Sequence, residues 1–152
     1  MNKILLILFL LLLNSCGYTS VYKNQKSQNF QINITGMKGD IEFNNLIKNE
    51  LKLFSNNTSN NIYNIALNSN YQKIAVTKNS SGVTTNYNIL AYVKVNLSLN
   101  ENNKNLVFKE NINIKNNVNS FEQNNYEKNV KKNFASSIRE KLILKIIELN
   151  DY

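Results

Sequence analysis

The amino-acid sequence predicts an α+β domain with two layers, in which a four-stranded sheet carries two helices packed on one face. Three observations lead to this fold class. Apolar residues occupy every second position in several segments, most clearly at residues 87–99. Two other segments repeat apolar residues at spacings of three and four, the period of an amphipathic helix. The elements follow one another in the order β-α-β-β-β-α, and a helix with one apolar stripe needs a sheet to cover it.

The first strand and the first helix are expected within residues 30–54. Residues 30–34 alternate between apolar and polar side chains, as a half-buried strand does. The stretch from Gly36 to Gly39 is expected to end this strand. Asp40 is a suitable N-cap for a helix over residues 40–54. The apolar stripe of that helix consists of Phe43, Leu46, Ile47, Leu51 and Phe54.

The second strand is expected to be irregular. Tyr63 and Leu67 share one face of the alternation, whereas Ile74 and Val76 fall on the opposite face. We therefore expect a β-bulge or a bend near Asn70. A polar turn at residues 79–82 then separates this strand from the next one.

The third strand, at residues 87–99, is the strongest pattern in the chain. At a rise of about 3.3 Å per residue it reaches more than about 40 Å, which is long for a domain of this size. A second turn is expected at residues 101–105 and a last strand at residues 106–114. Glu110 interrupts the apolar face of that last strand, so we expect it near an edge of the sheet or at a bulge.

A long helix is predicted to close the domain. Its apolar residues follow one another at intervals of four, and Asn124 followed by Glu127 has the pattern of a helix start. The basic residues along this helix are expected to form its solvated face. The stripe consists of Tyr126, Val130, Phe134, Ile138, Leu142 and Ile146, widened by Ala135 and Leu149.

The N-terminus has the layout of a secretory signal. Lys3 precedes ten apolar residues at positions 4–13, and this run is too short to cross a bilayer as a helix, which takes about 20 residues. Ser15 followed by Cys16 resembles the lipobox of bacterial lipoprotein signal peptides. In such proteins the cysteine is lipidated and becomes the first residue of the mature chain.

This resemblance divides the chain into a signal peptide at residues 1–15, a lipidated N-terminus with a flexible tether at residues 16–29, and a folded domain at residues 30–152. Cys16 is the only cysteine, so an intramolecular disulfide is excluded. The alternative is an ordinary cleaved signal that leaves Cys16 as an incidental thiol.

The composition predicts a protein that is not an enzyme. There is no His, and the only Asp residues are Asp40 and Asp151. Nucleophile–base pairs, general acid–base sites and zinc sites draw mostly on His, Cys, Asp and Glu held together. Glu110 and Glu122 are candidates to meet in space, but isolated glutamates on polar faces are usually solvated. We therefore expect no metal and no cofactor.

The charge of the chain favours acidic partners. The formal net charge is +8, and removal of Lys3 with the signal lowers it to +7. A basic protein attracts phosphorylated lipids, anionic surfaces or nucleic acid. An exported location makes nucleic acid the weakest of these candidates, so we expect no nucleic acid among the partners.

The order of features along the mature chain resembles that of one known family. These features are a Cys16-Gly17-Tyr18 start with Val21-Tyr22, a strand, Gly39-Asp40 opening a helix, a hairpin with a polar glycine turn, the strand at residues 87–99, and Phe134-Ala135 in the C-terminal helix. In this order the chain resembles the LptE family, the lipopolysaccharide-assembly lipoproteins of the bacterial outer membrane. The order of elements carries more weight than any single motif.

The resemblance implies a function. It implies a protein on the periplasmic face of the outer membrane, anchored by the lipid on Cys16 and seated as a plug inside the LptD β-barrel. There it would help the barrel assemble and help insert lipopolysaccharide at the cell surface. The family is thought to bind lipopolysaccharide through basic residues at the loop end of the sheet, and the matching candidates are Lys73, Lys78 and Lys104.

Two other classes of function stay open at this point. One is an outer-membrane lipoprotein that serves as a scaffold or pilotin for a different barrel or secretin. The other is a soluble enzyme or ligand carrier tethered by lipid, which the missing catalytic groups argue against.

Overall fold

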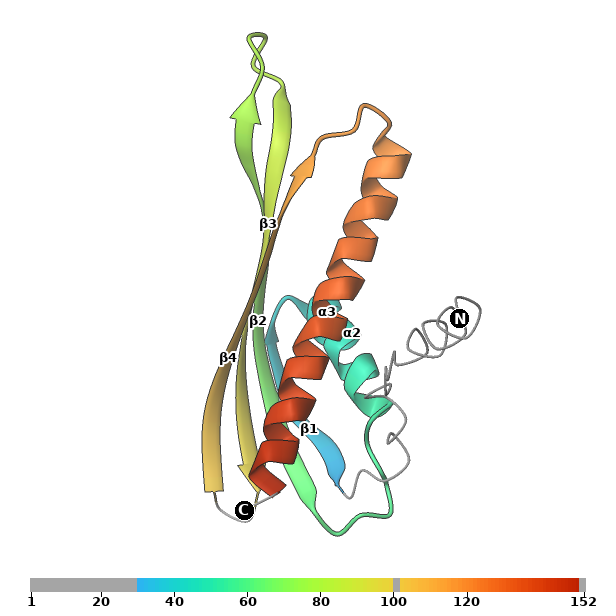
Figure 1. Ribbon diagram of the computed structural model, residues 1–152, viewed down its shortest axis with the longest axis vertical. Helices are drawn as coiled ribbons and strands as arrows, with labels where there is room; N and C mark the ends of the chain where they lie inside the picture. Colours follow the sequence, from blue (N-terminus) through green and yellow to red (C-terminus); the bar gives the residue numbers. More distant parts are fainter. Residues whose placement is uncertain (1–29, 100–101, 151–152) are drawn as a thin grey trace, which may run out of the picture.

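The computed structural model describes residues 30–99 and 102–150, and its elements follow the expected order (Figure 1). The sheet contains four strands and the second layer two helices. Their bounds are β1 (Gln31–Gly39), α2 (Ile41–Lys52), β2 (Ile62–Lys78), β3 (Thr84–Leu99), β4 (Asn102–Lys115) and α3 (Ser120–Asn150). The α+β fold class is confirmed.

The sheet has the simple strand order β1-β2-β3-β4. β1 pairs with β2 in parallel, whereas β2, β3 and β4 form an antiparallel meander. A parallel pair needs a crossover connection, and α2 supplies it. Both helices lie on the same side of the sheet, so no element of the described residues covers the opposite face (Figure 1).

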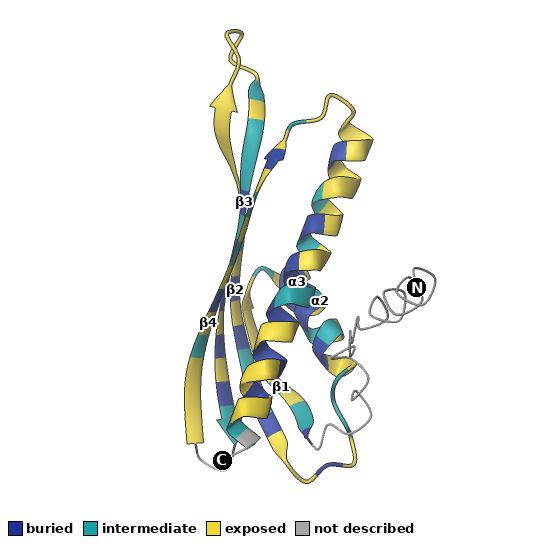
Figure 2. Ribbon diagram, in the orientation of Figure 1, coloured by how far each residue is buried: buried dark blue, intermediate teal, exposed yellow. Residues whose placement is uncertain are grey.

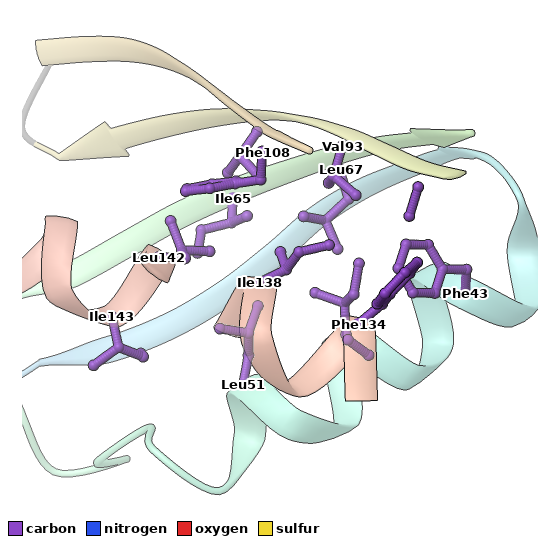
Figure 3. Packing of buried hydrophobic residues seen from close by; sticks show 14 of the residues in the cluster. Phe43, Leu51, Ile65, Leu67, Val93, Phe108, Phe134, Ile138, Leu142 and Ile143 are labelled. Carbon is purple, nitrogen blue, oxygen red and sulfur yellow. The ribbon is translucent and has the colours of Figure 1, made fainter. Parts of the chain in front are cut away.

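The core fills the space between the sheet and the two helices (Figure 3). β3 contributes Val93 and its alternating neighbours, and β2 contributes Ile65 and Leu67. Leu51 of α2 and Ile138 of α3 are fully buried against them. The two helical stripes that the sequence predicts therefore cover the alternating apolar face of the strands, as a two-layer architecture requires.

The first strand continues through the glycines, so the expectation that the stretch from Gly36 to Gly39 ends it is wrong. Pairing with β2 shifts register between Ile34 and Gly36 and then resumes as far as Gly39. A bulge of this kind inserts a residue without ending the strand. The strand ends at Gly39, whose φ of +86° turns the chain into α2. Asp40 is the expected N-cap, and its Oδ1 accepts a hydrogen bond from the Phe43 amide at 2.7 Å.

The second strand is regular near Asn70, so the bulge expected there is wrong. Its pairing with β3 runs without a break from Asn64 to Ala75, and the irregularity lies between Ala75 and Lys78. Ile74 has the opposite parity because the strand has passed the end of the core. Its side chain lies on the uncovered face and is 45 % exposed.

The fourth strand begins earlier than the sequence suggested. Asn102 already pairs with Leu99, so the turn expected at residues 101–105 is wrong for Asn102 through Asn105, which belong to β4. Asparagine is common in turns, but a regular ladder with β3 satisfies these backbone groups here. Glu110 lies on this edge strand, as expected, and pairs with Ala91 without a bulge.

The C-terminal helix begins at Ser120, before the expected start at Asn124. The side chain of Asn119 provides the cap, because its Oδ1 accepts hydrogen bonds from the amides of Phe121 at 3.0 Å and Glu122 at 3.3 Å. Asn124 is instead an exposed residue inside the helix.

The β2–β3 hairpin projects past the end of α3, and its outer part is exposed on both faces (Figures 1 and 2). We call residues 74–85, comprising the end of β2, the turn and the start of β3, the hairpin end. This segment has no helix beside it, so its side chains are available to a partner.

Candidate functional site

The turn of the hairpin end is held by one asparagine. The Asn79 Oδ1 accepts hydrogen bonds from the amides of Ser81 at 3.1 Å and Val83 at 2.9 Å. The Asn79 amide donates to the carbonyl of Val83 at 2.9 Å, and Gly82 adopts a φ of +78°. The turn expected at residues 79–82 is therefore present and internally hydrogen-bonded. Its flanking side chains are presented from a defined backbone.

Lys78 lies at the base of this turn and is exposed. It forms no ion pair with any residue that the structure describes. The hairpin end contains no Asp or Glu of its own. Lys78 is therefore unpaired within the described residues, and its contact with an anionic ligand stays a prediction.

Lys73 is engaged within the fold. Its Nζ lies 2.5 Å from the Oε1 of Glu127 on α3 and 4.0 Å from the centroid of the Tyr87 ring. Gln123 donates to the same carboxylate oxygen of Glu127. Lys73 thus ties the first half of α3 to the sheet, and the structure does not present it together with Lys78 as part of an exposed site.

Lys104 lies at the opposite end of the sheet from Lys78. It pairs with Leu97 on β3, whereas Lys78 pairs with Thr84. These two positions of β3 are 13 residues apart, which corresponds to about 43 Å at the usual rise of a strand. Lys104 borders a cavity of about 440 Å³ near the end of α3, lined also by Tyr63, Leu97, Leu99 and Leu149. The structure therefore does not bring the three predicted lysines together.

Lys115 is a basic residue at the hairpin end of the sheet that the sequence reasoning missed. It is exposed on β4, in the cross-strand row that contains Asn86 and Thr77. Lys115 lies two strand spacings across the sheet from β2 and about two residues along it from the row of Lys78, which corresponds to roughly 12 Å between the two Cα atoms. The alternation of Lys109, Asn111, Asn113 and Lys115 was the signal, because residues of one parity share a face.

A cluster around Tyr71 joins the two helices to the sheet. The Tyr71 ring lies 5.3 Å from that of Phe43, and the Nζ of Lys131 lies 4.7 Å from its centroid. Lys131 also forms an ion pair with Glu42 at 2.7 Å. Burial raises the pKa of Tyr71 to about 12, and the carboxylates of Glu127, Asp40 and Glu42 add to this rise. The buried hydroxyl has no hydrogen-bond partner among the described residues, and the ring contacts pack the two helices against the sheet.

A second cavity, of about 740 Å³, lies between the end of β4 and the first turns of α3. A polar network borders it. The Asn117 amide donates to Gln123 at 2.8 Å, and the Asn117 side chain donates to Glu122 at 2.8 Å.

Glu110 lies on the inner face of β4, where it binds Ser137 and Lys141 of α3. The two glutamates considered as a pair are thus each engaged in a separate contact.

No group of three or more acidic, His or Cys residues within residues 30–99 and 102–150 is placed to hold a metal ion. In the same residues no helix has the length and apolar content to cross a bilayer. Cys16, the predicted lipid attachment site, lies outside the described residues.

The fold resembles that of several solved lipoprotein structures. A rare lipoprotein B from Shewanella oneidensis has a TM-score of 0.57 and 9% identity, and the match covers 78% of this chain and 96% of that one. A chain from Caulobacter crescentus described as a lipoprotein has a TM-score of 0.59 and 14% identity over 79% and 90% of the two chains. The lipoprotein B of Nitrosomonas europaea, solved in solution, has a TM-score of 0.54 and 9% identity over 89% and 93%.

No family model and no curated protein sequence matches the chain. At 9–14% identity the structural matches establish a shared fold.

Proposed function

We propose that this chain is a lipid-anchored lipoprotein of the outer membrane that acts as the plug and assembly factor of an LptD-like β-barrel and assists lipopolysaccharide insertion at the cell surface. The observation that carries the proposal is the fold, which covers nearly the whole of three chains described as lipoproteins. The signal-like N-terminus and the single Cys16 agree with it.

The hairpin end suits the lipopolysaccharide step. Lys78 and Lys115 are exposed, lie at the same end of the sheet and form no ion pair with another described residue. Lipopolysaccharide carries phosphate groups, and an ammonium group attracts phosphate as a point charge. Lys73 contributes indirectly, because its ion pair with Glu127 sets the position of the strand that leads to Lys78.

Purification from membranes tests the partner. The full-length protein is extracted in mild detergent, and the proteins that come with it are identified by mass spectrometry. We expect an LptD-like barrel. Recovery of a different barrel or a secretin would replace the proposal with a scaffold or pilotin function, and recovery of no barrel would refute both.

Titration with lipopolysaccharide tests the hairpin end. We expect the double variant Lys78→Glu, Lys115→Glu to bind lipopolysaccharide at least about tenfold more weakly, because each reversal replaces an attraction by a repulsion. Lys104→Glu at the far end is the matched control and should bind normally. Equal binding by the double variant and the wild type would remove the hairpin end from the proposal.

Labelling with radioactive palmitate tests the anchor. Cys16→Ser should abolish incorporation and leave the domain folded, since residue 16 precedes the described fold. Labelling of the variant would show that the lipid is attached elsewhere or that the signal is misread.

A further inference from the structure

The uncovered face of the sheet has a composition of its own. We call it the outer face: it comprises the residues of β1–β4 whose side chains point away from α2 and α3. The register of β2, β3 and β4 aligns these residues in seven cross-strand rows, such as Asn70 with Tyr92 and Lys109. Every row contains at least one Asn or Gln, and the face holds thirteen amide side chains in all.

Charge is segregated between the two layers. The outer face carries four lysines, Lys38, Lys94, Lys109 and Lys115, and no carboxylate. All the carboxylates of the described residues belong to the helices and the N-cap of α2, apart from Glu110. Glu110 points to the inner face, where it binds Lys141 at 2.5 Å. The outer face therefore has a uniformly positive field, whereas the helix layer balances its charges.

The polar groups of the outer face have few partners within the chain. Among its amides, the hydrogen bonds between side chains are Asn33 to Asn64 at 2.8 Å and Asn86 to Thr77 at 2.9 Å. The Oδ1 of Asn88 is buried in the sheet surface and has no hydrogen-bond partner in the part of the chain that the structure describes. An amide side chain offers two donors and an acceptor with two lone pairs. Much of the hydrogen-bonding capacity of the face is available to another surface.

The dimensions of the outer face suit a protein interface. Seven rows cover about 40 Å along the strands, and β2, β3 and β4, each about 4.8 Å wide, cover about 15 Å across them. The resulting flat area, roughly 600 Å², approaches the 800 Å² or so that each partner contributes to a stable interface. Three aliphatic side chains add apolar contact, since Ile62, Ile74 and Val107 are 43 %, 45 % and 51 % exposed.

We propose that the outer face packs against the inner wall of the partner barrel, with the helix layer turned toward the lumen, and that the contacted strip of wall is rich in carboxylates and hydroxyls. This inference rests on the proposed function. The wall of a barrel lumen is itself a sheet with polar side chains at alternating positions. Two sheets pack face to face about 10 Å apart. Carboxylates would neutralise the four lysines, and hydroxyls would bond the unpaired amides.

Site-specific photo-crosslinking in the native cell tests which face meets the barrel. A photoreactive amino acid replaces Asn70 or Asn111 on the outer face, and Lys132 or Leu144 on the exposed side of α3 as matched controls. The full-length, lipidated protein is irradiated in intact membranes, and adducts are identified by mass spectrometry. We expect at least about tenfold more barrel adduct from the outer-face positions.

Each outcome of this experiment has one meaning. Barrel adducts from the α3 positions alone would overturn the inference and keep the proposed function. Adducts of the outer face with glycan, or with a protein that is not a barrel, would overturn the inference. A barrel that copurifies with the protein in detergent but forms no adduct from either face would also overturn the inference. The absence of any barrel in both experiments would overturn the proposed function itself.

Charge reversal gives an independent measurement. Lys94→Glu with Lys109→Glu should lower the amount of barrel that copurifies about tenfold or more, because like charges across an interface repel. Neither lysine forms an ion pair with a described carboxylate. Their ammonium groups lie 5.7 and 5.6 Å from the centroid of the Tyr92 ring, and thermal unfolding should change little because the fold loses only these two weak, exposed ring contacts. The control is Lys128→Glu with Lys132→Glu on α3. Equal losses in both double variants would show a general charge effect and overturn the inference.

Discussion

Replacing Gly39 by alanine tests the junction between the sheet and the helix layer. Gly39 has a φ of +86°, and a Cβ placed there would lie 1.8 Å from the carbonyl oxygen of Ser69. That oxygen accepts the Asp40 amide at 3.1 Å, and the Ser69 hydroxyl donates to the Asp40 carbonyl at 3.2 Å. A methyl group must therefore push β1 away from β2 just where α2 is capped.

The expected cost follows from these contacts. The left-handed backbone costs an alanine about 1–2 kcal/mol. Moving the chain far enough to relieve the clash breaks the two hydrogen bonds, at about 1 kcal/mol each. We expect the free energy of unfolding to fall by about 3–4 kcal/mol, a large part of the roughly 5–15 kcal/mol that stabilises a typical domain.

Urea unfolding of the domain without residues 1–16, followed by circular dichroism, measures this cost. A loss of about 3 kcal/mol moves the midpoint by about 2 M at a typical slope. Gly82→Ala is the matched control: its φ is +78° but a Cβ there meets nothing within 4 Å. Gly36→Ala has neither strain nor clash. If Gly39→Ala loses no more stability than Gly82→Ala, the close approach to Ser69 is not as described.

Three further variants test other contacts. Tyr71→Phe should reduce the loss of stability between about pH 10 and 12. The pKa of the phenol is near 10 in the unfolded chain and about 12 in the fold, so the wild type loses stability as the pH rises through this window. Identical pH profiles of the two proteins in urea unfolding would contradict the burial of this hydroxyl. Asn119→Ala should cost about 1 kcal/mol in urea unfolding because it removes the cap of α3, whereas Asn124→Ala should cost nothing; the reverse order would restore the later helix start. Glu110→Ala should lower the free energy of unfolding by about 1–3 kcal/mol, because Ser137 and Lys141 lose their partner near the sheet edge. A loss below about 0.5 kcal/mol, the size typical of an exposed ion pair, would show that the contact is not formed in solution.

The periodic features of the chain were predictable because burial and backbone geometry leave a direct mark on sequence. Residues 87–99 alternate strictly since every second side chain of β3 packs in the core. Asp40 was identifiable as a cap because few residue types accept hydrogen bonds from a helix start. The order of elements, and with it the fold class, follows from such local signals.

The errors lie where two local signals compete. Asn124 and Glu127 have the pattern of a helix cap and its partner. The helix is instead capped five residues earlier by the side chain of Asn119, and Glu127 binds Lys73. Ile74 and Val76 suggested a bulge because a change of parity has two explanations. The other explanation holds for Ile74, because the strand extends past the core and its uncovered face takes an apolar residue, whereas Val76 lies at the register shift between Ala75 and Thr77.

The candidate site was less predictable than the fold, because it depends on which ends of the strands meet. In an antiparallel meander, consecutive turns lie at opposite ends of the sheet. Lys78 and Lys104 follow the same kind of signal, a lysine beside a polar turn, and are therefore placed far apart. Lys115 lies near Lys78 although no turn signal marks it, since β4 returns to the hairpin end.

The ion pair between Lys73 and Glu127 joins the long β2–β3 hairpin to α3. Beyond this ion pair β4 accompanies β3 as far as the Asn86–Lys115 pair, and Asn116 donates hydrogen bonds to the carbonyls of Thr84 and Thr85, so only the turn and the residues next to it are held by the β2–β3 pairing alone. The hairpin end therefore meets the rest of the fold mainly through backbone pairing, and we expect a partner bound at the turn to bend it more readily than the strands that pack against the helices.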